Sequence, residues 1–356
     1  MNKFETIDFT GLGLGDCVAG MLVLAHLCEF DLDLELPYCT VIVPKALVGV
    51  GSALFQTYGL KIRNCLEAGT SLASRRRLIL RPPSSVKEIT TEMTGSRTHL
   101  NWAEFCELES SWTELWSTWS AARKLRFRLL QAIQYGFASP KTGGPVYIGF
   151  RLLFPLIRQS KFTLTAHVFH SKRTFSSIRR NVNAYISANS GGTCQTRGRN
   201  YRKLIFPGSE SFGAMPISVC MKLQEKFGDS VAFVLHESDI SLPHARRVLR
   251  QLIVVSTVEE TLCLISNNST ISVDSFVSHL IQMTNDDAVI LFGRELKERF
   301  VHPGAHPRIL EAFPECAPCI HRSKRMHALC PANRSECIAF DSLYTMLIDD
   351  MCRGLP

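Results

Sequence analysis

The chain has 356 residues, of which 46% are hydrophobic and 20% charged, and its formal net charge at pH 7 is +8. This length exceeds what one ordinary hydrophobic core holds and predicts two domains of about 150–200 residues each. No apolar run approaches the ~20 residues that span a bilayer and no secretory leader is recognisable, so we expect a cytoplasmic protein whose thirteen cysteines stay reduced or bind a metal.

The first predicted elements are a short strand within the segment TIDFT, a glycine-rich turn and an apolar helix. Glycines at alternate positions, Gly11, Gly13 and Gly15, let the backbone turn sharply and come close to a ligand. Asp16 then stands at the strand-to-helix turn, where it faces any cleft above the sheet. An aspartate at this place is also typical of a helix N-cap, and the sequence leaves both interpretations open.

A long basic segment follows between Glu114 and Glu210, with sixteen Lys and Arg residues and no acidic residue. This asymmetry predicts a polyanionic partner such as anionic lipid, phosphorylated glycolipid or nucleic acid. Just ahead of these basic residues lie all four tryptophans, the last three at the spacing of one helical stripe: Trp102, Trp112, Trp116 and Trp119. Such a stripe is typical of a helix at a membrane surface, and equally of a Trp-rich core face with a solvated basic end.

The segment 187–202 is rich in Gly, Ser, Asn and Thr and lacks apolar periodicity, which predicts a domain boundary. We therefore expect an N-terminal domain over residues 1–190 and a C-terminal domain over residues 200–356. After the boundary, strands and helices alternate as in a parallel α/β sheet. The predicted strands are 203–206, 231–235 and 253–256, and the predicted helices are 217–227, 243–252 and 258–266.

The segment Ile271–Gly293 contains a strand, a loop, a helix and a second strand. The first strand ends at Asp274, Ser275 follows in the loop, His279 is predicted to open the helix, and 288–292 forms the second strand. These side chains fall at the carboxyl end of a strand, where open α/β sheets bind ligands, and the N–H groups at the next helix start suit a phosphate. An Asp N-cap with a buried core histidine would give the same pattern.

A third loop of this kind follows the strand 203–206 and reads Pro207-Gly208-Ser209-Glu210-Ser211. Together the three loops resemble glycosyltransferase family 9, the heptosyltransferases of lipopolysaccharide core synthesis. The resemblance rests on the Gly-Asp before an apolar helix, the Pro-Gly-Ser loop, the donor loop Asp274–Leu280 and the Leu-Phe-Gly that ends at Gly293. It extends to a Pro-Gly at 303–304 and a C-terminal cysteine cluster, and covers both ends of the chain.

The resemblance implies a GT-B fold, in which two Rossmann-like α/β domains with parallel sheets face each other across a cleft. It implies an inverting enzyme that moves a heptose or related sugar from a nucleoside diphosphate donor resembling ADP-heptose to a glycolipid or glycan, without a catalytic metal. Asp16 is then the base that deprotonates the acceptor hydroxyl. The implied donor-binding residues are Gly208, Ser209, Ser211, Asp274, Ser275 and His279.

Some residues depart from the family pattern. Phe276 stands where the family has a glycine, and its side chain crowds a diphosphate; the Lys and Trp that the family carries before Pro216 are absent. Arg294, which follows the Leu-Phe-Gly, is the candidate for the missing phosphate contact. These changes predict a divergent donor or acceptor, or lost activity.

Four cysteines near the end of the chain have the spacing of a tetrahedral metal site: Cys316, Cys319, Cys330 and Cys337. Four protein ligands leave no open position, so we expect structural zinc or iron, with His321 and His327 as substitute ligands. Free buried cysteines are the alternative interpretation.

Two other functions stay compatible with the sequence. One is a glycosyltransferase that acts on protein, and the other is a catalytically silent relative that binds a polyanion through the basic segment. For the lipid-acceptor enzyme we expect a peripheral position on the inner face of the cytoplasmic membrane, with an anionic membrane surface rather than nucleic acid as the partner.

Overall fold

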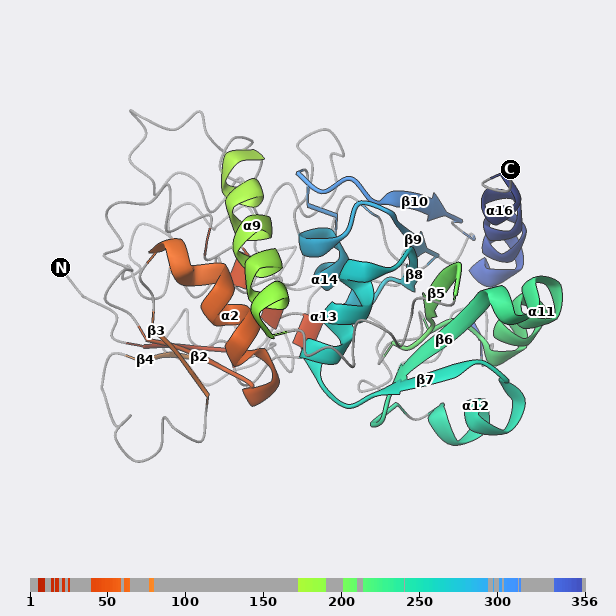
Figure 1. Cartoon of the computed structure of the whole chain (residues 1–356), viewed down its shortest axis with the longest axis horizontal. Helices are drawn as coiled ribbons and strands as arrows, with labels where there is room; N and C mark the ends of the chain where they lie inside the picture. The colour runs from red at the N-terminus through yellow and green to blue at the C-terminus, as the bar shows by residue number, and fades with distance from the viewer. Residues whose placement is uncertain are drawn as a thin grey trace, which may run out of the picture. The chain divides into compact units, whose positions relative to one another are not determined.

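A computed structural model describes residues 6–9, 14–15, 17–18, 21–22, 25, 40–58, 61–64, 77–79, 172–189, 201–209, 214–239, 241–293, 297, 301–302, 304–312, 314 and 336–353. The chain divides into two compact units, Met1–Asn181 and Val182–Pro356. Each unit contains a parallel sheet (Figure 1), so the predicted α/β class is confirmed. The cleft between two facing domains and the limits 1–190 and 200–356 stay predictions.

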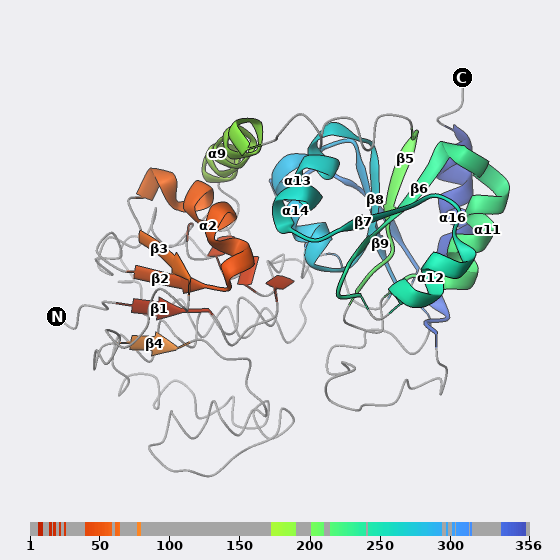
Figure 2. The same cartoon turned by 60° about the horizontal axis from the view of Figure 1, so that its bottom comes forward.

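The sheet of the first unit has the order β3-β2-β1-β4, with all neighbours parallel. The strands are β1 (Thr6–Asp8), β2 (Thr40–Val43), β3 (Lys61–Asn64) and β4 (Arg77–Ile79). Between β2 and β3 lie the 3-10 turn η3 (Lys45–Leu47), the helix α2 (Val48–Phe55) and the 3-10 turn η4 (Gln56–Tyr58). Figure 2 shows the four strands stacked in this order. Because β2 and β3 lie on one side of β1 and β4 on the other, the strand order reverses at β1.

The sheet of the second unit has six parallel strands in the order β10-β9-β8-β5-β6-β7. The strands are β5 (Lys203–Phe206), β6 (Val231–His236), β7 (Leu252–Val255), β8 (Thr270–Val273), β9 (Ala288–Phe292) and β10 (Arg308–Glu311). The chain runs from β5 outward to β7 and then returns to place β8 on the other side of β5. This is the doubly wound order of dinucleotide-binding folds, and it reverses between β5 and β8.

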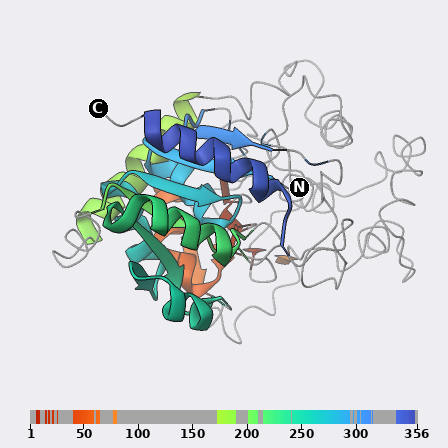
Figure 3. The ribbon, with the colours of Figure 1, turned by 90° about the vertical axis from the view of Figure 1, so that its right-hand side faces the viewer.

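Helices cover both faces of this sheet, as Figure 2 shows: α13 and α14 on one, and α11, α12 and α16 on the other. The helices are α11 (Ile217–Phe227), α12 (Leu242–Val248), α13 (Val258–Asn267), α14 (Phe276–Thr284) and α16 (Ala339–Arg353), and the 3-10 turn η8 (Gly228–Ser230) follows α11. α16 packs beside α11 (Figure 3). A parallel sheet buried on both faces explains the almost continuous apolar runs of its strands.

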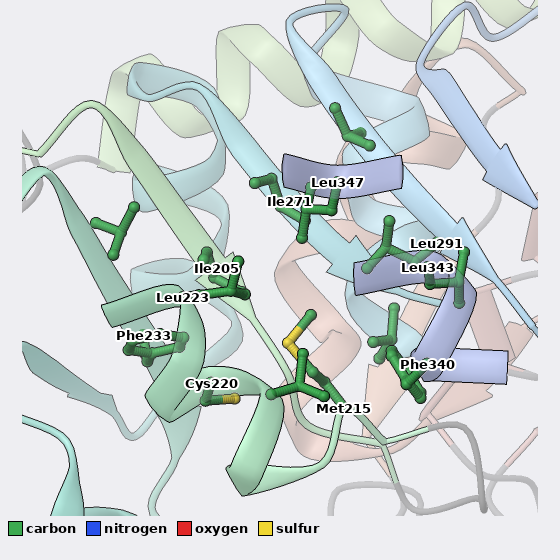
Figure 4. Packing of buried hydrophobic residues seen from close by; sticks show 14 of the residues in the cluster. Ile205, Met215, Cys220, Leu223, Phe233, Ile271, Leu291, Phe340, Leu343 and Leu347 are labelled. Carbon is green, nitrogen blue, oxygen red and sulfur yellow. The ribbon is translucent and has the colours of Figure 1, made fainter. Parts of the chain in front are cut away.

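Side-chain alternation divides the second core into two layers. Alternate strand residues, among them Ile205, Ile271 and Leu291, pack against α11 and α16 in one cluster with Cys220 and Leu343 (Figure 4). The residues between them in the strands, such as Phe206 and Phe292, therefore point to the α13 and α14 face. Gly293 directly follows β9 and lies against α16. A Cβ at this position would lie 2.5 Å from the Cβ of Ala339.

Several predicted elements are confirmed at their limits, namely β5, α11 and β9. The prediction that His279 opens a helix is wrong, because α14 begins three residues earlier at Phe276, where Ser275 and Ser278 cap its first turn. The predicted helix 243–252 ends already at Val248, because Leu249 is extended and Leu252 belongs to β7.

The helix α9 (Lys172–Asn189) runs through the start of the predicted boundary segment, so Ser187 is still helical. Its Tyr185 donates to Glu259 of α13 over 3.1 Å, and burial together with this carboxylate raises the pKa of the Tyr185 hydroxyl to about 12. Trp102, Trp112, Trp116 and Trp119 lie outside the described residues. Among the helices that are described, none has the length and apolar character needed to cross a bilayer.

Candidate functional site

Two central strands of the second unit end side by side at the same edge of the sheet. β5 and β8 are in register, with Phe206 beside Ser272, so the loop after β5 and the turn after β8 begin at nearly the same level. Open α/β sheets bind ligands outside the carboxyl ends of their strands at the point where the strand order reverses, which here lies between β5 and β8. The fold thus brings two sequence-predicted segments together, Gly208–Ser209 and Asp274–Ser275.

Hydrogen bonds fix the turn after β8 to both of its neighbours. The Ser209 hydroxyl donates to the backbone oxygen of Asp274 over 3.5 Å, and the Asp274 N–H donates to the backbone oxygen of Leu291 over 3.1 Å. The carboxylate-bearing Asp274 is only 8% exposed. Its backbone is therefore held by the Ser209 hydroxyl on one side and by the backbone of β9 on the other, and its side chain is enclosed at the sheet edge.

The helix that follows this turn presents its N-terminus at the same edge. Ser278 Oγ donates to the Ser275 backbone oxygen over 2.6 Å and accepts from the Ser275 N–H over 3.3 Å, which closes the first turn of α14. Ser275 Oγ occupies the N-cap, but it is buried and makes no hydrogen bond of ordinary geometry in the described part of the chain. A helix N-terminus with a hydroxyl at its cap is suited to an anion, because the first N–H groups lack helical partners.

His279 lies in this first part of α14 and is 6% exposed. Burial disfavours the charged imidazolium and lowers the pKa of His279 to about 4. At neutral pH the imidazole is therefore neutral, so it contributes hydrogen-bonding capacity and no positive charge. The burial of His279 agrees with the alternative interpretation, but the N-cap is Ser275 and not Asp274, so the predicted Asp N-cap is wrong. His279 lies one turn into the helix from the candidate anion site.

Asp239 is a residue of this site that the sequence interpretation missed. A Cβ added to Gly208 would lie 2.3 Å from Asp239 Oδ2, so the carboxylate faces the loop after β5 at close range. Asp239 Oδ1 accepts from the N–H and the hydroxyl of Ser241 over 2.9 and 2.6 Å, which orients the other oxygen toward Gly208. The signal in the sequence was the polar cluster HESD immediately after the predicted strand 231–235.

The loop after β1 is described only at its ends. Gly15 and Cys17 are helical, and the Cys17 thiol donates to the backbone oxygen of Phe9 over 3.3 Å, which holds the two ends of the loop together. Asp16 lies outside the described residues, so its role as a base stays a prediction. The topology indicates a candidate ligand site at this loop, because β1 is the strand at which the order of the first sheet reverses.

Other predicted site residues also lie outside the described part of the chain: Ser211, Arg294, Cys316, Cys319 and Cys330. Cys337 is described, is partly buried, and precedes α16, where its backbone oxygen accepts from the Phe340 N–H over 3.2 Å. The described residues contain no group of three or more His, Cys, Asp or Glu side chains that is placed to hold a metal ion. The structural zinc or iron site stays a prediction.

No protein-family model and no curated protein sequence matches the chain. Its structure is similar to that of E. coli heptosyltransferase WaaC with ADP, at 12% identity and a TM-score of 0.47, over 97% of this chain and 98% of that one. It is similar to E. coli ADP-heptose lps heptosyltransferase II at 13% identity and a TM-score of 0.45, over 98% and 100% of the two chains. A family 9 glycosyl transferase from Veillonella parvula DSM 2008 gives 13% identity and a TM-score of 0.37, over 87% of each chain.

Proposed function

We propose that the chain is a glycosyltransferase that moves a sugar from a nucleoside diphosphate donor to a glycolipid or glycan, with inversion at the anomeric carbon. The observation that carries this proposal is the convergence of Gly208–Ser209 and Asp274–Ser275 at the reversal point of the second sheet. The motifs that resemble family 9 are independent support, because they were identified from residue types and spacing alone.

The donor diphosphate is assigned to the loop after β5 and the N-terminus of α14. Ser209, Ser275 and the first N–H groups of α14 supply hydrogen-bond donors, and the helix dipole supplies positive potential equal to about half an elementary charge. Neutral His279 adds a donor without charge. Asp239 is assigned to the ribose hydroxyls, because a carboxylate accepts from hydroxyls and repels phosphate.

The acceptor chemistry is assigned to Asp16 of the first unit. Its carboxylate takes the proton of the acceptor hydroxyl while that oxygen attacks the anomeric carbon. The bond from the anomeric carbon to the diphosphate oxygen breaks in the same step, and the departing negative charge is stabilised by the α14 N-terminus. Asp274, which is enclosed beside the diphosphate site, is assigned to orienting the loop or to the donor sugar.

The acceptor class and the structural metal form the finer part of the proposal. We assign a lipid acceptor and peripheral binding to the inner face of an anionic membrane on the basis of the basic segment and the tryptophans ahead of its basic residues. The cysteine cluster that ends at Cys337 is assigned to structural zinc or iron. The proposed donor resembles ADP-heptose. The proposed reaction requires no catalytic metal.

The test is donor-dependent release of nucleoside diphosphate by the full chain. A thermal-shift screen with ADP, GDP, UDP and CDP selects the nucleotide, since ligand at 100 times its dissociation constant stabilises a protein by about 2.7 kcal/mol. The corresponding nucleotide sugars are then supplied with a glycolipid-containing or glycan acceptor mixture. We expect release that requires both substrates and is lost in Asp16→Ala.

The alternatives give different results in the same assays. A silent polyanion-binding relative would show no release with any donor, together with binding to heparin that falls steeply with salt. A glycosyltransferase that acts on protein would release nucleotide with a protein acceptor and retain this activity in the absence of lipid. A chain that binds no nucleoside diphosphate at all contradicts the proposal.

A further inference from the structure

In the described part of the chain, the candidate diphosphate site lies among negatively charged side chains. The described segments at this edge of the sheet carry several carboxylates, among them Glu237, Asp239 and Asp274. His279 is neutral at physiological pH. A diphosphate carries two or more negative charges, so a nearby cation strengthens its binding beyond what one helix N-terminus gives. Among the described segments at the carboxyl ends of the six strands, Lys297 is the one Lys or Arg residue.

The register of the sheet places this lysine on the face that carries α14. Val273, Leu291 and Leu310 lie side by side on β8, β9 and β10 and face the opposite layer, with α11 and α16. One residue further on, Phe292 lies beside Glu311 in register. Because side chains alternate along a strand, Glu311 points to the α14 face.

Lys297 binds Glu311 there, with 2.5 Å between Nζ and Oε2. The Asp274 N–H donates to the Leu291 oxygen and the Ala312 N–H to the Phe292 oxygen. The hydrogen-bonded pairing of β8 with β9 and of β10 with β9 therefore continues one residue beyond the ends of β8 and β10. Neighbouring strands are about 4.8 Å apart, so Glu311 lies roughly 10 Å from Asp274 across the intervening β9. A lysine side chain has a flexible four-carbon stem, so its ammonium can leave Glu311 and turn toward this part of the sheet edge.

The ion pair itself is poorly shielded from water. The Lys297 side chain is 41% exposed and the Glu311 side chain 20%. Pairs of this kind contribute about 0–1 kcal/mol to stability, so little is lost when the ammonium leaves the carboxylate for a partner of higher charge. Asp274 and Ser275, by contrast, are held by backbone bonds and do not need to move.

We propose that Lys297 is a diphosphate-binding residue of this site, held by Glu311 in the free protein and transferred to the phosphate oxygens when the nucleotide binds. The inference rests on the proposed function, since it assigns a further contact to the same diphosphate. Glu311 then acts as a competitor for the lysine. Its removal tightens binding, whereas removal of the lysine weakens binding.

The experiment measures binding of pyrophosphate and of the nucleoside diphosphate selected in the screen, by isothermal titration calorimetry in EDTA-containing buffer. We expect Lys297→Met to raise the dissociation constant of both ligands about tenfold, the scale of one charge-assisted hydrogen bond. We expect Glu311→Gln to lower it roughly two- to threefold, because a neutral amide holds the ammonium less strongly than the carboxylate does. Lys297→Arg retains most of the affinity.

The matched control is Arg308→Met. Arg308 stands at the other end of β10 from Glu311 and forms an ion pair with Asp350 over 2.7 Å. The substitution therefore removes an exposed, paired cation at the end of the strand that is remote from the candidate site. We expect it to leave both dissociation constants unchanged. Equal affinity of Lys297→Met and the parent chain overturns the inference, and so does a Glu311→Gln chain that binds as weakly as Lys297→Met. A parent chain that binds neither ligand instead overturns the proposed function.

Discussion

In each of the two sheets of this chain the strand order reverses once, and the loops at the two reversal points carry different residues. In the first sheet the order reverses at β1, and in the second it reverses between β5 and β8. The loop after β1 carries three alternate glycines and then Asp16, whereas the loop after β5 reads Pro-Gly-Ser. We therefore expect the loop after β1 to present a carboxylate at this place in the fold, whereas Gly208 and Ser209 of the loop after β5 are uncharged.

Under the proposed function, this difference divides the steps of the transfer reaction between the two loops. A carboxylate is useful where a proton must be removed, and it is harmful where a diphosphate must be bound. Neutral donors and a helix N-terminus have the opposite properties. We therefore expect substitutions in the two loops to separate turnover from nucleotide binding.

The largest separation is expected from Asp16→Asn. The amide keeps the size of the side chain and cannot accept the proton, so turnover falls by about 10²–10⁴-fold, the usual contribution of a general base. The dissociation constant of the nucleoside diphosphate should stay within twofold of the parent value. Nucleotide release and calorimetry on the same protein preparation check both quantities. A matching loss of nucleotide affinity would place Asp16 in the donor site and remove the contrast between the loops.

The second expected effect comes from Gly208→Val. A Cβ at this position lies 2.3 Å from Asp239 Oδ2, so the loop after β5 or Asp239 must move. Misplacement of a positioned group by about 1 Å can lower a reaction rate about a hundredfold. We expect a comparable rise in the nucleotide dissociation constant.

Gly228→Ala is the control for Gly208→Val. Gly228 has a φ of 55° and nothing within 4 Å of an added Cβ, so alanine there is strained by its backbone alone. We expect a stability loss of about 1–3 kcal/mol and no change in nucleotide affinity. If Gly228→Ala weakens nucleotide binding as much as Gly208→Val does, general destabilisation explains both results.

Much of the second unit was predictable because its signals are local. β5 and α11 have the predicted limits, and the apolar run of β9 ends at Gly293 as expected, where the neighbouring α16 leaves no room for a Cβ. Gly208, Ser209, Asp274 and Ser275 were named from loops that are far apart in the sequence. Their meeting follows once both segments are recognised as ends of parallel strands.

The errors arose where local patterns were ambiguous or where contacts are not local. The start of α14 was placed at His279, because Phe276 and Val277 look like part of a polar turn until the Ser275–Ser278 hydrogen bonds are seen. Asp239 was missed because its approach to Gly208 depends on the pairing of β5 with β6. The proposed role of Lys297 has no local signal in the sequence either, because its pairing with Glu311 depends on the folded arrangement of β9 and β10.

A third prediction concerns the pH dependence of stability. The pKa of His279 is about 4 in the folded chain and near 6.5 when the chain is unfolded, so the unfolded state binds more protons between these values. The unfolding free energy is therefore unaffected above about pH 7 and falls by about 2 kcal/mol on going from pH 7.5 to pH 5. Urea unfolding of the parent chain and of His279→Gln at both pH values measures the difference, which should disappear in the variant. An equal loss in both proteins would assign the pH dependence to other groups.

The smallest expected effect sharpens the assignment inside the donor site. Asp239→Asn removes the negative charge but keeps a side chain that reaches the same place. We expect the dissociation constant of the nucleoside diphosphate to rise roughly fivefold, because hydrogen bonds from ribose hydroxyls to a charged acceptor exceed those to a neutral one. The dissociation constant of pyrophosphate should fall or stay constant, because pyrophosphate has no ribose and is repelled by the carboxylate.

Ser241→Ala is the control for the last prediction, since Ser241 orients Asp239 through Oδ1 without facing Gly208. We expect its effect on the nucleotide dissociation constant to stay within twofold, because the Ser241 N–H still donates to the carboxylate. A weaker affinity of Asp239→Asn for the nucleotide without a weaker affinity for pyrophosphate places the carboxylate at the ribose. Parallel responses of the two ligands show instead that Asp239 acts through the shape of the loop after β5, since only a change common to the whole loop affects a ligand that has no sugar.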